Sequence, residues 1–157
     1  MGELRAFTVE AAETVAAWVI SADEAARWGG VLEHPVRPAI LAAWHAEPGV
    51  VPFLLVDSDE PVGYGELWED EGEAELARLV VDPERRGRGL GRELVEGLVE
   101  EARRRNFDEI WIRVVPENEP AIRCYRNAGF VRTSVENETA FNEGQPRVYQ
   151  WMRHGGA

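Results

Sequence analysis

The spacing of apolar residues changes along the chain and divides it into three predicted regions. In the first region, apolar positions recur at the spacing of one helix face over residues 9–21, with Thr8 as the predicted N-cap. A shorter helix is predicted near residues 23–28, where a Gly-Gly pair follows, and another at 38–47, where Pro38 lies near the start. The chain therefore begins with a group of helices.

The second region consists of short apolar runs bounded by polar turns. These runs lie at residues 52–56, 62–68 and 73–81, and clusters of acidic residues separate them. Strands joined by such short turns pair with their neighbours in an antiparallel manner. We expect a three-stranded meander here.

The third region begins with a glycine-rich loop and a helix over residues 89–105, whose leucines are spaced by four along one face. The β-rich segment 109–115 follows, and a right-handed crossover would place it parallel to the strand 73–81. Asn118 is predicted to cap a helix that ends near residue 127, where Gly129 fits the left-handed C-terminal position.

Two closing strands complete the pattern, at residues 130–135 and 147–152, joined by a long polar loop. The predicted order is helices, an antiparallel meander, a βαβ unit, a helix and a C-terminal hairpin. This order is typical of a single α/β domain over residues 1–157, with a mixed central sheet flanked by helices.

Composition narrows the functional classes. The formal net charge of −12 argues against a general nucleic-acid-binding protein, since phosphate contacts need basic surface, and it favours cationic substrates. We expect no membrane partner, because no stretch approaches the roughly 18 apolar residues that span a bilayer. The lone cysteine, Cys124, excludes an internal disulfide framework, and without an apolar signal core at the N-terminus we expect a cytoplasmic protein.

The loop at residues 86–91 (RGRGLG) carries the first chemical signal. Glycines at a helix N-terminus expose backbone N–H groups to an anion, and the helix dipole adds to the attraction. A Walker loop is excluded, because the chain contains no lysine. A dinucleotide fingerprint starting at Gly87 fails, because Arg92 occupies its sixth position.

Two motifs in register resemble those of the GNAT superfamily of N-acetyltransferases. The first has the form Gln/Arg-x-x-Gly-x-Gly/Ala and is carried by Arg86, Gly89 and Gly91. The second lies downstream at the spacing that a helix–strand unit requires and is carried by Asn118, Ala121, Tyr125, Gly129 and Phe130. The resemblance covers roughly residues 52–130 and implies a GNAT-like fold with acetyl-CoA as cosubstrate and no metal.

The resemblance also implies roles for individual residues. The strand before the loop would pair with the pantetheine arm, the loop N–H groups would hold the pyrophosphate, and Asn118 would bind the pantetheine amide. The implied cofactor-binding residues are Leu79, Val80, Val81, Arg86, Gly87, Arg88, Gly89, Leu90, Gly91 and Asn118. Tyr125 matches the tyrosine that protonates the departing thiolate, and its alternative is a core tyrosine beside Phe130.

Two carboxylates are candidates for the base that deprotonates the acceptor amine. Alternation along the strand places Glu75 on the same face as Leu79 and Val81, and some relatives have their base at the matching position. Glu66 on the neighbouring strand is the competitor. Arg113 departs from those relatives that carry a glutamate base at that position.

These motifs do not identify the acceptor amine. A polyamine, an aminoglycoside, an amino acid and a protein N-terminus all fit the acidic composition. The candidates for lining an apolar or cation-binding pocket are Trp18, Trp28, Trp44 and Trp68, and we expect at least two of them to pack in the core instead. Attack by the amine is direct, so Cys124 is expected to be an inert thiol. The alternatives to an enzyme are an acetyl-CoA sensor without turnover and an interaction module. A homodimer is compatible with the family.

Overall fold

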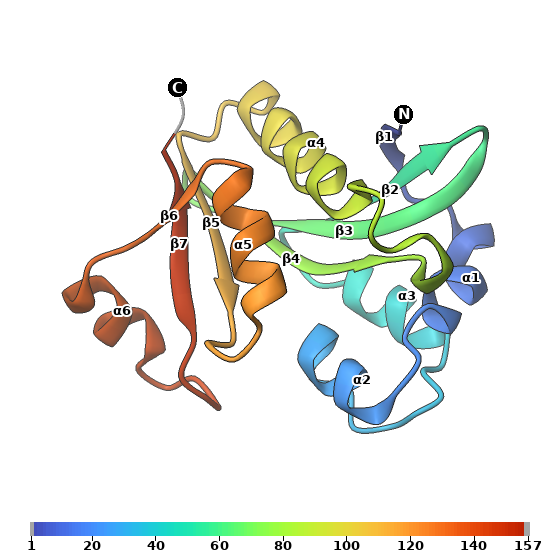
Figure 1. Ribbon diagram of the computed structural model, residues 1–157, viewed down its shortest axis with the longest axis horizontal. Helices are drawn as coiled ribbons and strands as arrows, with labels where there is room; N and C mark the ends of the chain where they lie inside the picture. Colours follow the sequence, from blue (N-terminus) through green and yellow to red (C-terminus); the bar gives the residue numbers. More distant parts are fainter. Residues whose placement is uncertain (1, 156–157) are drawn as a thin grey trace.

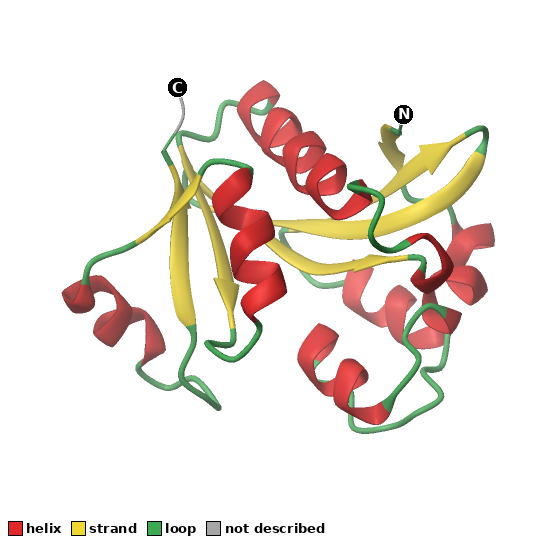
Figure 2. Ribbon diagram, in the orientation of Figure 1, coloured by secondary structure: helices red, strands yellow, loops and turns green. Residues whose placement is uncertain are grey.

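The computed structural model describes residues 2–155 of the chain, which form one mixed sheet with helices on both faces (Figures 1 and 2). The sheet has seven strands in the order β1-β2-β3-β4-β5-β7-β6. The strands are β1 Glu3–Ala6, β2 Val50–Asp57, β3 Glu60–Asp70, β4 Glu73–Val81, β5 Glu109–Val114, β6 Phe130–Arg132 and β7 Gln150–His154. As predicted, β2–β4 form an antiparallel meander, and β5 runs parallel to β4.

The helices divide between the two faces of the sheet. The long helix α4 and the helix α5 cover one face, and their apolar sides pack with those of the central strands into one core cluster. The N-terminal helices form a second cluster against the other face of β2–β4. The α-helices are α1 Ala12–Ala17, α2 Ala22–Gly29, α3 Ala39–His45, α4 Leu90–Arg104, α5 Glu119–Asn127 and α6 Val135–Asn142, and two 3-10 helices lie at η1 Val9–Ala11 and η2 Pro83–Arg85.

The predicted first helix was too long. The structure divides residues 9–21 into η1 and the short α1, and the side chain of Thr8 makes no cap. The chain is extended again at Ser21, whose hydroxyl accepts a hydrogen bond from the backbone N–H of Glu24 at 3.1 Å. Because an N-cap residue has an extended backbone, capping of α2 by Ser21 requires the preceding helix to end first.

Two further elements differ from the predictions. The edge strand β1 was missed, since four residues with one half-buried position carry no clear alternation. The long polar loop contains α6, and the last strand begins at Gln150 rather than at residue 147. Ser134 caps α6, and Phe141 packs edge-on against Trp111 and Trp151, so tertiary contacts stabilise a helix that has little amphipathic pattern.

A β-bulge in β4 determines the geometry of the site. Tyr64 pairs with Val80 and Glu66 with Ala77, so two residues of β4, Arg78 and Leu79, oppose the single Gly65 of β3. Arg78 has a left-handed backbone with φ of 51°. The extra residue reverses the alternation of side chains along the rest of the strand.

The bulge overturns the predicted orientation of Glu75. Leu79 and Val81 pack against the α4 side of the sheet, as Leu76 does, whereas Glu75 points to the opposite face. Pairing between β4 and β5 ends at Leu76 and Ile112, just before the bulge. Beyond that point the two strands separate.

Candidate active site

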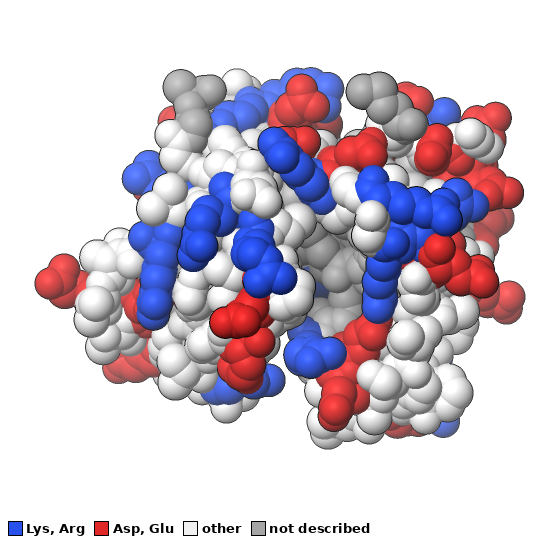
Figure 3. All heavy atoms as spheres, viewed as in Figure 1, with Lys and Arg blue, Asp and Glu red and all other residues white. Residues whose placement is uncertain are grey.

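A cleft of about 670 Å³ opens where β4 and β5 separate. Its walls come from α2, the loop before α4, and α5, and Figure 3 shows the molecule hollowed at this place. Eleven of the twelve residues predicted for cofactor binding or catalysis line it, and only Arg88 lies outside. These lining residues are Glu75, Leu79, Val80, Val81, Arg86, Gly87, Gly89, Leu90, Gly91, Asn118 and Tyr125.

The glycine-rich loop has the backbone that its glycines predict. Gly87 and Gly89 both have φ of 80°, and no atom lies within 4 Å of a Cβ added at either position. Gly89 is the N-cap of α4, so the first N–H groups of this 15-residue helix have no acceptor within the helix. The loop therefore offers unshielded backbone donors and a positive dipole end to an anion.

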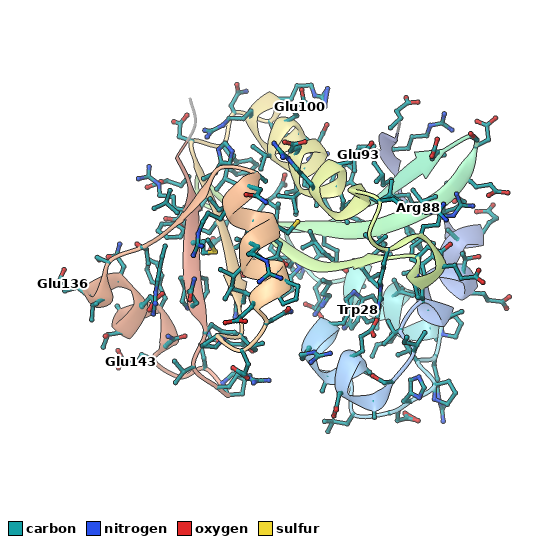
Figure 4. The ribbon with its side chains drawn as sticks, in the orientation of Figure 1. Trp28, Arg88, Glu93, Glu100, Glu136 and Glu143 are labelled. Carbon is teal, nitrogen blue, oxygen red and sulfur yellow. The ribbon has the colours of Figure 1, made fainter. Side chains whose placement is uncertain are left out.

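The two arginines of the loop differ in position. The guanidinium of Arg86 lies 2.6 Å from the carboxylate of Glu24 on α2, and both side chains line the cleft. Arg88 is exposed and does not line the cleft, and Figure 4 labels it on the loop beside the α4 N-terminus. The ion pair thus links the glycine-rich loop to α2, the helix that forms the opposite wall.

Asn118 both caps α5 and lines the cleft. Its side-chain oxygen accepts a hydrogen bond from the backbone N–H of Ala121 at 3.3 Å, as the sequence predicts. The side-chain amide is left to donate to a molecule in the cleft. Gly129 has a positive φ of 104° after the helix end, in agreement with its predicted position.

Tyr125 projects from α5, and its ring packs against Phe130 with centroids 6.4 Å apart. Within residues 2–155, its hydroxyl has no hydrogen-bond partner, although the side chain lines the cleft. Burial, with a smaller contribution from Cys124, raises the pKa of Tyr125 far above that of an ordinary tyrosine. The hydroxyl therefore stays protonated and is free to donate to a group in the cleft.

Glu75 is held by Arg113, the residue that departs from the family pattern. The two side chains form a bidentate pair with N–O distances of 2.6 and 2.8 Å, and Arg113 also donates to the side-chain oxygen of Gln145 at 3.0 Å. The guanidinium lies 4.5 Å from the ring centroid of Trp151. These contacts build one wall at the end of the cleft where the two strands part.

Glu66, the competing carboxylate, lies in a different environment. It is fully buried and does not line the cleft. Its oxygens accept hydrogen bonds from the hydroxyl of Tyr64, from the indole of Trp68 at 2.8 Å and from Arg78 at 3.1 Å. Burial raises the pKa of the Glu66 carboxyl, and these donors oppose that shift. His45 donates to the Tyr64 oxygen at 2.9 Å and extends the network to α3.

This network stabilises the bulge. A left-handed backbone at a residue other than glycine is unfavourable by about 1 kcal/mol or more. The Arg78 guanidinium lies over the rings of Trp44 and Trp68, 3.9 and 4.9 Å from their centroids. Its carbonyl accepts a hydrogen bond from the indole of Trp28 at 2.7 Å. The prediction did not include Arg78, although a charged residue inside an apolar strand was a signal for it.

The tryptophans of the N-terminal region divide between the cleft and the core. Trp18, Trp28 and Trp44 are buried in the second core cluster, and of these only Trp28 also lines the cleft, as Trp68 on β3 does. Cys124 also lines the cleft, and burial raises the pKa of its thiol, which favours the unreactive form. Within the described part of the chain, no cluster of side chains has the composition of a metal site, and no helix there is long and apolar enough to cross a membrane.

Comparison with known proteins gives a consistent result. The acetyltransferase (GNAT) family model matches residues 14–130. The chain is 30% identical over 144 residues to aminoglycoside N(6')-acetyltransferase type 1 of Klebsiella pneumoniae, which covers 78% of this chain and 68% of that protein. It is 36% identical over 63 residues to the ribosomal protein bS18-alanine N-acetyltransferase of Escherichia coli K12, which covers 40% and 43% of the two chains. The solved structure of AAC(6')-Ib in complex with ribostamycin and coenzyme A has a TM-score of 0.76 at 26% identity, with 98% of this chain and 92% of that chain covered.

Proposed function

The chain belongs to the GNAT family of acetyltransferases, and on that basis we propose how its cleft carries out acetyl transfer to an amine. The enzyme is an N-acetyltransferase that uses acetyl-CoA as cosubstrate. The proposal rests on one observation above all: the free Tyr125 hydroxyl, the unpaired edge of β4 and the open glycine loop line the same cleft.

The cofactor lies along the cleft from the loop to the strand edge. The pyrophosphate binds at the N–H groups of residues 86–91, and Arg86 exchanges Glu24 for the phosphates. The pantetheine arm then pairs with the edge of Leu79–Val81, because β5 no longer occupies that side of β4 after Leu76. Asn118 donates its amide to the arm. This path brings the thioester to the end of the cleft near Tyr125.

The chemical step is direct attack of a neutral amine on the thioester carbonyl. Backbone N–H groups of the β4 edge stabilise the oxyanion that develops on the carbonyl oxygen. The nitrogen loses a proton as the carbon–sulfur bond breaks, and Tyr125 donates a proton or a hydrogen bond to the departing thiolate. A tyrosine of raised pKa suits this role, because it remains protonated at neutral pH.

Glu75 is the carboxylate that faces the incoming ammonium in this proposal. It lines the cleft, whereas Glu66 is sealed from the cleft and has its oxygens engaged by three donors. The substrate ammonium replaces one of the two Arg113 hydrogen bonds to the Glu75 carboxylate and forms an ion pair with it. The ammonium proton then passes to Glu75 directly or through water. Glu66 contributes indirectly in this proposal: its ion pair with Arg78 supports the bulge, and the bulge determines the position of the free β4 edge.

The test is release of free thiol from acetyl-CoA in the presence of different amines. We expect release with at least one class among polyamines, aminoglycosides, amino acids and peptides. Thermal stabilisation by acetyl-CoA without thiol release from any of these amines would instead favour a sensor. Absence of both signals would contradict the placement of the cofactor.

Four further predictions accompany the proposal: a cytoplasmic location, a homodimer, and no nucleic-acid or membrane partner. The acidic composition supports the third, because a formal net charge of −12 opposes binding to phosphate backbones. Sedimentation of the purified chain at several concentrations tests the dimer. A single species at the monomer mass of 17.6 kDa throughout would contradict it.

A further inference from the structure

A second hollow of about 610 Å³ adjoins the acceptor end of the cleft. It lies on the face of the sheet opposite α4, because Trp111 on β5 points away from the core cluster that contains its neighbours Ile110 and Ile112. The hollow is walled by aromatic rings and rimmed by carboxylates. We call it the acidic groove, and its lining residues include Trp68, Trp111, Phe141, Trp151, Glu47, Glu69, Asp70, Glu73 and Glu75.

The acidic groove adjoins the cleft. Trp68 and Glu75 line both spaces, whereas Arg113, the partner of Glu75, lines the cleft alone. A molecule whose reacting amine lies at Glu75 is therefore placed to extend past this side chain into the groove. The two volumes are each in the range of sites for small molecules.

The charge of the groove is unbalanced. Glu69 is paired with Arg105 at 3.1 Å and Glu75 with Arg113, but neither Lys nor Arg is among the residues that line the groove. Among the residues that the structure describes, the exposed carboxylates Glu47, Asp70 and Glu73 have no ion-pair partner. Several carboxylates beside a low-dielectric aromatic surface create a negative potential, which attracts cations to the groove.

The aromatic wall also has an unsatisfied donor. Trp111 is 8% exposed, and its indole N–H has no acceptor within residues 2–155. Its ring packs edge-on against Phe141, with centroids 5.1 Å apart. Buried donors of this kind are normally satisfied, so Trp111 is an exception among the residues that line the groove.

We propose that the acidic groove binds the distal ammonium of a small polycationic acceptor while another amine of the same molecule is acetylated in the cleft. This inference rests on the proposed function, and it specifies the acceptor as a molecule with at least two protonated amines. Attraction comes from Asp70 and Glu73 on the rim and from the aromatic rings beneath them.

The experiment compares two acceptors and three proteins. Spermine carries several ammonium groups, whereas butylamine carries one. Steady-state acetylation of both amines is measured with the native chain, with the double variant Asp70→Asn/Glu73→Gln, and with Glu100→Gln. Glu100 is an exposed glutamate on the outer side of α4, away from the groove (Figure 4), and its substitution tests whether the loss of a surface carboxylate elsewhere has the same effect.

We expect the double variant to raise the KM for spermine about tenfold, as the loss of two partly screened attractions predicts, while kcat stays the same. The KM for butylamine should not change, and 0.5 M salt should reduce the difference between the proteins. Glu100→Gln should behave as the native chain. Equal changes for both amines, or no change for either, would overturn the proposal.

A binding measurement separates failure of this inference from failure of the proposed function. Calorimetric titration of spermine into the CoA-bound protein needs no turnover, and the double variant should bind about tenfold more weakly. Spermine binding of equal strength in both proteins overturns the groove assignment even when butylamine is acetylated. Acetylation confined to peptides with a basic residue would place a peptide, and not a small polycation, in the groove. Loss of thiol release with every amine contradicts the proposed function instead.

Discussion

Two carboxylates on neighbouring strands, Glu66 and Glu75, are each paired with an arginine and each adjoin Trp68, yet they lie in opposite environments. Glu66 is sealed beneath the N-terminal helices and accepts hydrogen bonds from three side chains. Glu75 lines the cleft, and its partners are Arg113 and, through it, Gln145. The same chemical pair thus supports a strained backbone in one place and forms a wall of the cleft in the other.

The tyrosines show the same division. Tyr64 is fully buried and lies between His45 and Glu66, with its hydroxyl engaged on both sides. Tyr125 lines the cleft, and its hydroxyl has no partner within the described residues. A polar group whose hydrogen bonds are complete contributes to folding, whereas one left unpaired in a cavity is available to a ligand.

The largest expected effect on stability comes from breaking the buried ion pair between Glu66 and Arg78. Glu66→Gln leaves the Arg78 guanidinium, 12% exposed, without its charged partner, and we expect the free energy of unfolding to fall by about 3 kcal/mol. Glu75→Gln should lower it by only about 1 kcal/mol, since its arginine lies at the cleft wall and keeps water and Gln145 as partners. Urea unfolding of both variants gives the two values. Equal losses would remove the distinction between the two carboxylates.

The next effect separates the two tyrosines. Tyr125→Phe should lower kcat about 100-fold, as expected for the loss of an acid catalyst, while acetyl-CoA binds with unchanged affinity. Tyr64→Phe should show the reverse pattern, with turnover largely kept in the folded protein and unfolding easier by about 1–2 kcal/mol. Turnover and urea unfolding are measured for both. Full activity of Tyr125→Phe would exclude Tyr125 from the acid role.

A smaller effect is expected at the loop. Gly89→Glu places a carboxylate beside the pyrophosphate, and we expect acetyl-CoA to bind at least about tenfold more weakly. Gly72→Glu is the matched control, because Gly72 also has a positive φ, of 86°, and open space around its added Cβ. Both variants carry the same backbone strain, so a difference in affinity measured by calorimetry reports the loop alone. Similar affinities would contradict the pyrophosphate assignment.

The smallest expected effect is an absence of change with pH. Because burial raises the pKa of Tyr125, its hydroxyl stays protonated at pH values where an ordinary tyrosine, of pKa about 10, begins to ionise. Turnover at saturating substrates should therefore show no decline between about pH 9 and pH 10. A decline with a midpoint near 10 that is absent from Tyr125→Phe would show that the tyrosine titrates normally in the cleft.

Much of the architecture could be predicted from local pattern. The meander, the amphipathic helix α4 and the parallel β5 follow from periods of two and of 3.6 residues, and Gly129 was correctly expected to have a positive φ after the end of α5. The helix α6 escaped prediction because it is held by Phe141 against Trp111 and Trp151, which are distant in the chain. The orientation of Glu75 was predicted wrongly because simple alternation does not anticipate the bulge at Arg78.

Short motifs were enough to predict the family and to select the glycine-rich loop, Tyr125 and Asn118 as candidate site residues, because the spacing within each motif is fixed by one helix or one turn. The folded chain was needed to show which carboxylate lines the cleft, where β4 and β5 part, and that an acidic groove adjoins the cleft. Those features depend on the one-residue bulge in β4, and its left-handed arginine is stabilised by Trp28, Trp44 and Glu66, which come from three separate elements. Contacts between distant segments leave no periodic signal along the chain.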